Sequence, residues 1–155
     1  MIHIRTGADK NNWFLLALQV NLAMRMGYHR DPSHFPGILP LQGEMRRRLW
    51  ATVLTSDILI SSQMGMARMI SDWQCNTAEP RNLNDTEMDE YAVELPPPWP
   101  ETEYTTSLGV IARRRMIMAF GAISDLTDAV KPCSYSEIMR VDGVLHDAAA
   151  TIPPL

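Results

Sequence analysis

Residues 41–64 read LQGEMRRRLWATVLTSDILISSQM and predict one long helix at the centre of the fold. Apolar side chains recur at helical spacing on two faces, one that carries Val53 and another that carries Trp50 and Leu54. A helix that is apolar on two faces is typically buried between neighbouring layers. Gly65 follows directly, and glycine at this position commonly ends a helix in a left-handed conformation.

Three further segments show helical periodicity of their apolar residues, at about 10–28, 106–130 and 134–150. The first is expected to end at Gly27, because Pro32 prevents the helix from resuming. The last opens with Ser134 and Glu137, which have the spacing of a capping box. The sequence therefore predicts an all-α fold, an antiparallel helical bundle or array that occupies residues 1–155 as a single domain.

A long stretch without helical periodicity, about 67–104, separates the second and third predicted helices. It is rich in proline and in acidic residues, and loops of this length are usually functional or wrapped over a scaffold. Asn84 to Glu87 could form a short capped helical turn within it. Four large side chains are expected to anchor the loop to the helices: Trp73, Leu83, Tyr91 and Trp99.

Three consecutive arginines, Arg46, Arg47 and Arg48, lie near the start of the long helix. Consecutive helical positions are about 100° apart, so at least one of these side chains must face neighbouring elements. The flanking residues are apolar and the chain has a formal net charge of −4, which disfavours a DNA-facing patch. We therefore expect buried pairing with Asp57 or with the acidic loop, and the same reasoning gives Arg115 an acidic partner.

The segment Tyr28-His29-Arg30-Asp31-Pro32 places a histidine near an aspartate, as a catalytic base and its orienting group would be. The other elements of a kinase site, such as a glycine-rich loop, are missing from the sequence. The segment reads better as a helix-end turn, in which Asp31 bonds nearby backbone amides. We expect no catalytic residue and hence no enzyme.

Metal binding and membrane insertion are also not indicated by the sequence. The acidic residues of the loop lack the central glycine of a calcium-binding loop, and the four histidines are scattered without metal-ligand spacing. The two cysteines cannot form a zinc site by themselves, and the longest apolar run, Phe14 to Leu18, is too short to span a membrane. We therefore expect no metal site and a nuclear or cytosolic protein.

Eleven methionines are an unusually high number for this length. Methionine fills irregular apolar gaps and adapts to varied partners, so a loosely packed helical core is one interpretation. The alternative is an adaptable pocket or groove, in which ligand- or partner-facing positions would be Met64, Met116 and Met118.

Two motifs, Gly27-Tyr28-His29-Arg30-Asp31 and Glu44-Met45-Arg46-Arg47-Arg48-Leu49-Trp50, resemble the fungal-specific transcription factor domain in their residues and order. This domain is the middle regulatory region of fungal zinc binuclear-cluster transcription factors. Ala67 departs from the family, which usually has proline there. The resemblance implies a signature of structural residues: Gly27, His29, Arg30, Asp31, Glu44, Arg46, Arg47, Arg48, Trp50, Asp57, Gly65, Pro80, Asn82 and Asp85.

The resemblance implies regulation of RNA polymerase II transcription from the nucleus, through ligand sensing or association with itself or co-regulators. DNA binding and zinc would belong to a six-cysteine cluster domain that this sequence does not contain. The chain is then expected to be part of a regulatory domain, with a small hydrophobic molecule as a candidate ligand. Two alternatives stay open: a stand-alone helical interaction module without ligand, and a helical enzyme that binds a small molecule.

Overall fold

The computed structural model describes residues 7–152, and within them it contains helices and no strands. The four α-helices are α1 (Gly7–Arg25), α2 (Pro40–Met64), α3 (Leu108–Thr127) and α4 (Tyr135–Ala150). The all-α prediction is confirmed. The observed helix ends lie within a few residues of the predicted ones, as expected when periodicity and capping residues locate the helices.

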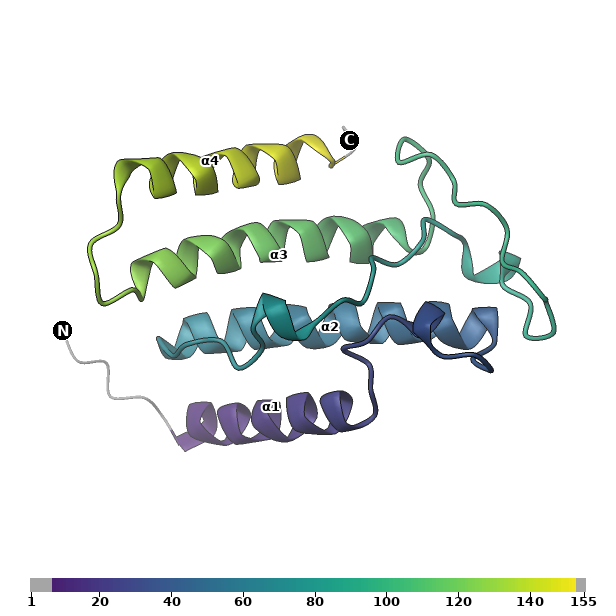
Figure 1. The fold of residues 1–155 in the computed structure, drawn as a ribbon, viewed down its shortest axis with the longest axis horizontal. Helices are drawn as coiled ribbons and strands as arrows, with labels where there is room; N and C mark the ends of the chain where they lie inside the picture. Colours follow the sequence, from purple (N-terminus) through teal and green to yellow (C-terminus); the bar gives the residue numbers. More distant parts are fainter. Residues whose placement is uncertain (1–6, 153–155) are drawn as a thin grey trace.

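The helices lie side by side in one row, in the order α1, α2, α3, α4 (Figure 1). Helix α2 packs against both α1 and α3, which agrees with its two apolar faces, whereas α4 packs against α3. The α1–α2 and α3–α4 pairs are antiparallel, but α2 and α3 run in the same direction. Contacts between Arg48 and Ser107 at one end, and between Arg68 and Asp125 at the other, confirm this direction.

The predicted antiparallel arrangement therefore holds for two of the three neighbouring pairs. The chain between α2 and α3 runs back along the length of α2 before α3 begins. Helix α3 therefore starts at the same end as α2 (Figure 1). A short turn would have made these two helices antiparallel.

The main hydrophobic core lies between α1 and α2 and includes one residue of the following loop. Its buried members are Leu16, Val20, Ala23, Trp50, Val53, Leu54 and Ile70. Because Ile70 comes after α2, this core also attaches the beginning of the long connection to the α1–α2 pair.

Helices α2 and α3 approach each other closely at Gly121. A Cβ atom at this position would lie 3.2 Å from Cδ1 of Ile58, a fully buried residue of α2. Packing and not backbone conformation favours glycine here, because an added Cβ would require Ile58 to move by a few tenths of an ångström and no positive φ occurs at this residue.

We expect the substitution Gly121→Ala to destabilise the chain by about 1–3 kcal/mol, the usual cost of overpacking a core. The matched control is Gly143→Ala in α4, where an added Cβ would meet no atom within 4 Å. That change should stabilise the chain by about 0.5–1 kcal/mol, because alanine loses less backbone entropy in a helix. Urea unfolding of both variants tests the pair, and equal stabilisation by both would contradict the close approach.

Local signals in the sequence account for the ends of the helices. Gly65 ends α2 with φ of 58°, and its N–H bonds to the Ser61 and Ser62 carbonyls as a C-cap. Gly27, with φ of 77°, turns the chain after α1. Ser134 and Glu137 form the predicted capping box at the start of α4.

The connections contain three short 3-10 helices, η1 (Pro32–His34), η2 (Asp72–Gln74) and η3 (Asp85–Glu87). The predicted turn near Asn84 is thus η3. Of the four predicted anchors, Leu83 is fully buried. Trp99 is 47% exposed and bonds Glu87, which belongs to the connection itself, so this bond does not anchor the loop to a helix. Trp73 and Tyr91 are 82% and 87% exposed, so the prediction that they anchor the loop is wrong. No described helix is long and apolar enough to cross a membrane.

Candidate functional site

Asp31, in the turn after α1, is the centre of the first polar cluster. Its carboxylate accepts two hydrogen bonds from Arg47 of α2, at 2.8 and 2.9 Å. It also accepts the backbone N–H groups of Ser33 and Ala78. Asp31 is only 4% exposed, and its four bonds join the α1–α2 turn, α2 and the long connection.

The electrostatics of Asp31 follow from this geometry. Its pKa is held well below the ordinary carboxyl range, chiefly by the Arg47 guanidinium and against the opposing effect of burial. Hydrogen bonds from Ser33 and from the Ala78 amide lower the pKa further. The carboxylate is therefore ionised at neutral pH and is not available as a general base.

Glu44 and Arg48, one turn apart on α2, form the second cluster. The fully buried Glu44 carboxylate accepts Arg48 Nε at 3.3 Å and the backbone N–H of Arg81 at 3.0 Å. Arg48 extends to Asp85, at 2.5 Å, and to Ser107. This cluster attaches residues 81–85 of the connection and the residue before α3 to α2.

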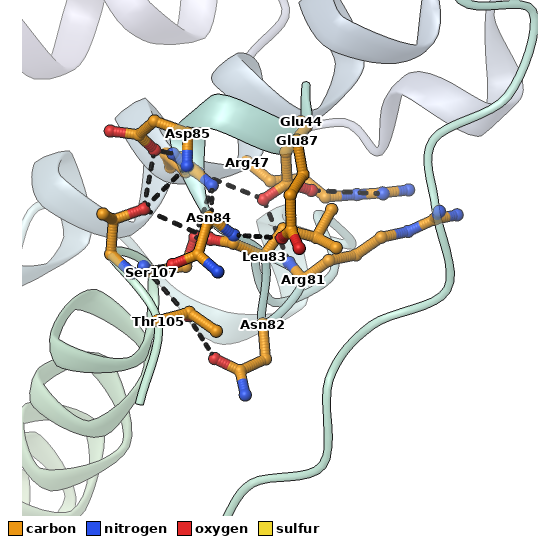
Figure 2. A network of polar contacts seen from close by, with 12 residues as sticks. Glu44, Arg47, Arg81, Asn82, Leu83, Asn84, Asp85, Glu87, Thr105 and Ser107 are labelled. Carbon is orange, nitrogen blue, oxygen red and sulfur yellow. Dashed lines mark hydrogen bonds and ion pairs between the residues drawn. The ribbon is translucent and has the colours of Figure 1, made fainter. Parts of the chain in front are cut away.

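Hydrogen bonds made by side chains join the connection to the start of α3, and Figure 2 shows this region around Asn82, Leu83 and Ser107. Buried Ser107 donates its hydroxyl to the Leu83 carbonyl at 2.7 Å. Buried Asn82 donates to the carbonyls of Trp99, Pro100 and Glu103. These bonds close the proline-rich segment into a loop on itself, and α3 begins from that closed loop.

Asp57, in the middle of α2, caps the chain that follows the helix. Its fully buried carboxyl group accepts the backbone N–H groups of Met69 at 3.1 Å and Ile70 at 2.9 Å, and the Ser61 hydroxyl at 3.3 Å. Of the two partners expected for the arginines, Asp57 pairs with neither Arg47 nor Arg48, whereas Asp85 of the acidic loop pairs with Arg48. The arginines pair with Asp31, Glu44 and Asp85, because the chain after Gly65 folds back and brings its own amides to Asp57.

Arg115 has the acidic partner that was expected for it. It bonds Glu79 at 2.9 Å and Glu101 at 2.7 Å, and the neighbouring Arg114 also bonds Glu79. These pairs connect α3 to two separate parts of the connection. The hydrogen bond from the Arg115 guanidinium holds the pKa of Glu101 below its usual range.

The other signature residues have mostly packing roles. The Arg46 guanidinium lies over the Tyr28 ring at 5.1 Å, and the His29 ring lies 6.2 Å from that of buried Trp50. Pro80 is buried, whereas Arg30 is exposed and lies outside the clusters described above.

The polar clusters described above together form what we call the polar network. Five of its members were not expected from the sequence, namely Asn76, Thr77, Glu79, Thr105 and Ser107. Thr77 donates its hydroxyl to the Tyr28 carbonyl, and Asn76 accepts the Asp31 N–H. The run Thr105-Thr106-Ser107 before α3 was a signal for such capping, although it could not identify which residue reaches Leu83.

The polar network holds the fold together and does not have the arrangement of a catalytic site. Its charged groups are paired with each other and with backbone amides. Among residues 7–152, no group of three or more His, Cys, Asp or Glu side chains could hold a metal ion. The network links the α1–α2 turn, α2, the connection and α3.

The outer face of α1 is the second feature with functional potential. It presents large apolar side chains that are 55–68% exposed, on the side away from buried Leu16 and Val20: Phe14, Leu15, Leu18 and Leu22. Met26, in the turn directly after α1, is also exposed. No charged residue occurs between Lys10 and Arg25. Contiguous exposed apolar surface of this kind usually marks an interaction site.

The three methionines proposed to face a ligand or partner are all half-buried. Met118 lines a cleft between α3 and α4 of about 470 Å³, together with Arg114, Arg140 and Asp147. Their predicted role stays a prediction.

Comparison with known proteins places these observations in a family context. The model of the fungal specific transcription factor domain matches residues 1–105. The chain is 48% identical over 143 residues to the Zn(2)-C6 fungal-type transcription factor mpsB of Macrophomina phaseolina, covering 92% of this chain and 19% of that protein. No solved structure matches the chain.

Two other relatives show similar coverage. The Zn(2)-C6 fungal-type transcription factor pigI of Monascus ruber is 48% identical over 91% of this chain and 17% of its own length. The equisetin cluster transcription factor eqxF of Fusarium heterosporum is 41% identical over 98% of this chain and 22% of its own length. The chain thus spans about a fifth of the length of these curated relatives.

Proposed function

The chain belongs to the fungal specific transcription factor domain family, and we propose that it is a regulatory region of a nuclear Zn(2)-C6 transcription factor. In this role it is not an enzyme and takes part in regulating transcription by RNA polymerase II. DNA binding and zinc belong to a separate cluster domain of the parent protein. The polar network supports this role, since its charged groups are used in mutual pairing and backbone capping.

The target of the parent protein is, in our proposal, a gene cluster. One relative, 41% identical over 98% of the chain, is named a cluster transcription factor. Deleting the parent gene should therefore lower or raise the transcripts of a contiguous group of neighbouring genes together. Unchanged transcripts across every neighbouring gene would contradict the proposal.

Association with a protein, either a second copy or a co-regulator, is the mode of action that the geometry supports best. The observation that carries it is the uncharged apolar outer face of α1. Helix α1 packs against α2 on one side, and large exposed apolar side chains on its other side usually mark an interaction site. The remaining side offers Phe14, Leu18 and Leu22 at successive turns.

We expect the isolated chain to form oligomers, and we expect Leu18→Glu to raise the Kd for association by about tenfold or more. Burying an unpaired carboxylate costs several kcal/mol, and about 1.4 kcal/mol already corresponds to a tenfold change. The matched control is Gln19→Glu, which adds the same charge at the next, also exposed, position of α1. Light scattering over a protein concentration series measures the Kd, and a monomeric parent chain would contradict the prediction.

Ligand sensing is a second candidate, favoured by the presence of clefts beside α4. Helix α4 packs on α3 alone among the described helices, and Val141 and Ala148 are its buried residues. A small hydrophobic molecule could therefore change how firmly α4 is held, which would give the regulatory region two states.

A further inference from the structure

An apolar cleft of about 350 Å³ lies between the C-terminal half of α3 and the N-terminal half of α4. It is separate from the Met118 cleft and from the polar network. Aliphatic side chains of both helices line it, namely Ile123 and Leu126 of α3 and Ile138, Val141 and Leu145 of α4. The cleft exists because α4 contributes few buried side chains to its contact with α3.

Two groups at the edge of the cleft restrict what it can bind. Asp142 is its charged residue, with a side chain that is 53% exposed and 3.4 Å from His146. This carboxylate disfavours an anion. The Cys133 thiol donates to the Leu126 carbonyl at 3.2 Å, so its hydrogen is already used and the sulfur presents a weakly polar surface.

The size of the cleft also limits the occupant. Ligand pockets generally measure about 300–1,000 Å³, which places this cleft at the small end of the range. It suits a compact molecule of one or two rings better than the side of a partner helix, which would need a long groove.

We propose that this cleft is a binding site for a compact, uncharged apolar molecule. Such a ligand would contact both helices at once and would hold α4 against α3. The inference rests on the proposed regulatory role for its biological meaning, whereas the binding itself is tested without any transcriptional readout.

The experiment uses indole as a neutral two-ring probe and measures how fast a maleimide labels each cysteine of the chain. Cys133 lies at the cleft, and Cys75 provides an internal reference because it packs against the α1–α2 core. At an indole concentration of about ten times its Kd, mass action should slow Cys133 labelling by about tenfold. Cys75 labelling should stay unchanged.

Matched variants assign the effect to the cleft. Leu145→Trp places a larger ring in the cleft and should abolish the protection, whereas Val144→Trp, one residue away and outside the cleft lining, should keep it. Circular dichroism checks that both variants keep α4. Asp142→Asn should allow the anion indoleacetate to protect Cys133, which it should not do in the parent chain.

Several outcomes would overturn the proposal. These are equal slowing at both cysteines, no slowing at Cys133, or protection that persists in Leu145→Trp. Protection of Cys133 that rises with protein concentration in the absence of indole would show that a second copy of the chain covers the cleft. Failure here leaves protein association through α1 intact, since Leu18→Glu tests that separately.

Discussion

Replacing Asp31 with alanine is expected to lower the free energy of unfolding by about 3–5 kcal/mol, the usual cost of leaving one member of a buried ion pair without its partner. The substitution leaves the Arg47 guanidinium, whose side chain is 15% exposed, without its bidentate carboxylate. It also frees the N–H groups of Ser33 and Ala78. Urea unfolding followed by circular dichroism measures the loss.

The control for this prediction is Asp85→Ala. Asp85 also pairs with an arginine, Arg48, but its side chain is 63% exposed. Exposed pairs contribute about 0–1 kcal/mol, so this variant should remain close to the parent chain in stability. Equal losses for the two variants would show that burial does not distinguish the pairs.

Acid titration gives an independent readout of Asp31. Its folded-state pKa lies below its ordinary value, so it stabilises the fold above the ordinary carboxyl range. This stabilisation should be lost as the pH falls from that range towards the lowered pKa. The difference in stability between the parent chain and Asp31→Ala should therefore shrink in acid, and a difference that grows would contradict the assignment.

Replacing Asp57 with alanine is expected to cost about 3 kcal/mol or more, because each buried polar group left unsatisfied costs about 1–3 kcal/mol. The change removes the acceptor for the N–H groups of both Met69 and Ile70. Ile70 belongs to the α1–α2 core, so the start of the connection should also loosen. Hydrogen exchange at these two amides measures the local effect, and urea unfolding the global one.

Two milder variants separate the contributions at this site. Ser61→Ala removes only the hydroxyl bond of 3.3 Å and should cost less than Asp57→Ala. Asp57→Asn keeps one acceptor oxygen for one of the two amides, so it should fall between the parent chain and alanine. Unchanged exchange at Met69 and Ile70 in Asp57→Ala would contradict the capping role.

Asp31 and Asp57 also explain how the long connection is held against a single row of helices. Asp31 attaches the connection at Ala78, and Asp57 attaches it at Met69 and Ile70. Both aspartates bond backbone amides, which every residue except proline carries. These contacts therefore fix the path of the backbone and do not depend on the side chains of the bonded residues.

Much of the fold and part of the site could be predicted from sequence. The helix of residues 41–64 was located almost to the residue, because its apolar periodicity and its end at Gly65 are properties of neighbouring residues. The capping box of Ser134 and Glu137 is equally local. The apolar residues that flank Arg46, Arg47 and Arg48 predicted acidic partners, which Arg47 and Arg48 have. Arg46 instead lies over the Tyr28 ring.

The partners themselves were decided by the tertiary structure. Arg47 pairs with Asp31 and Arg48 with Asp85, while Asp57 receives amides, and the bonded residues are separated by 12 to 37 positions in the chain. The tertiary structure also decided that α2 and α3 run in the same direction. Helical periodicity and capping depend on residues that are three or four positions apart, so they can be recognised directly in the sequence. Which distant groups meet depends on the path of the connection, which follows from packing and hydrogen bonds formed only when the whole chain has folded.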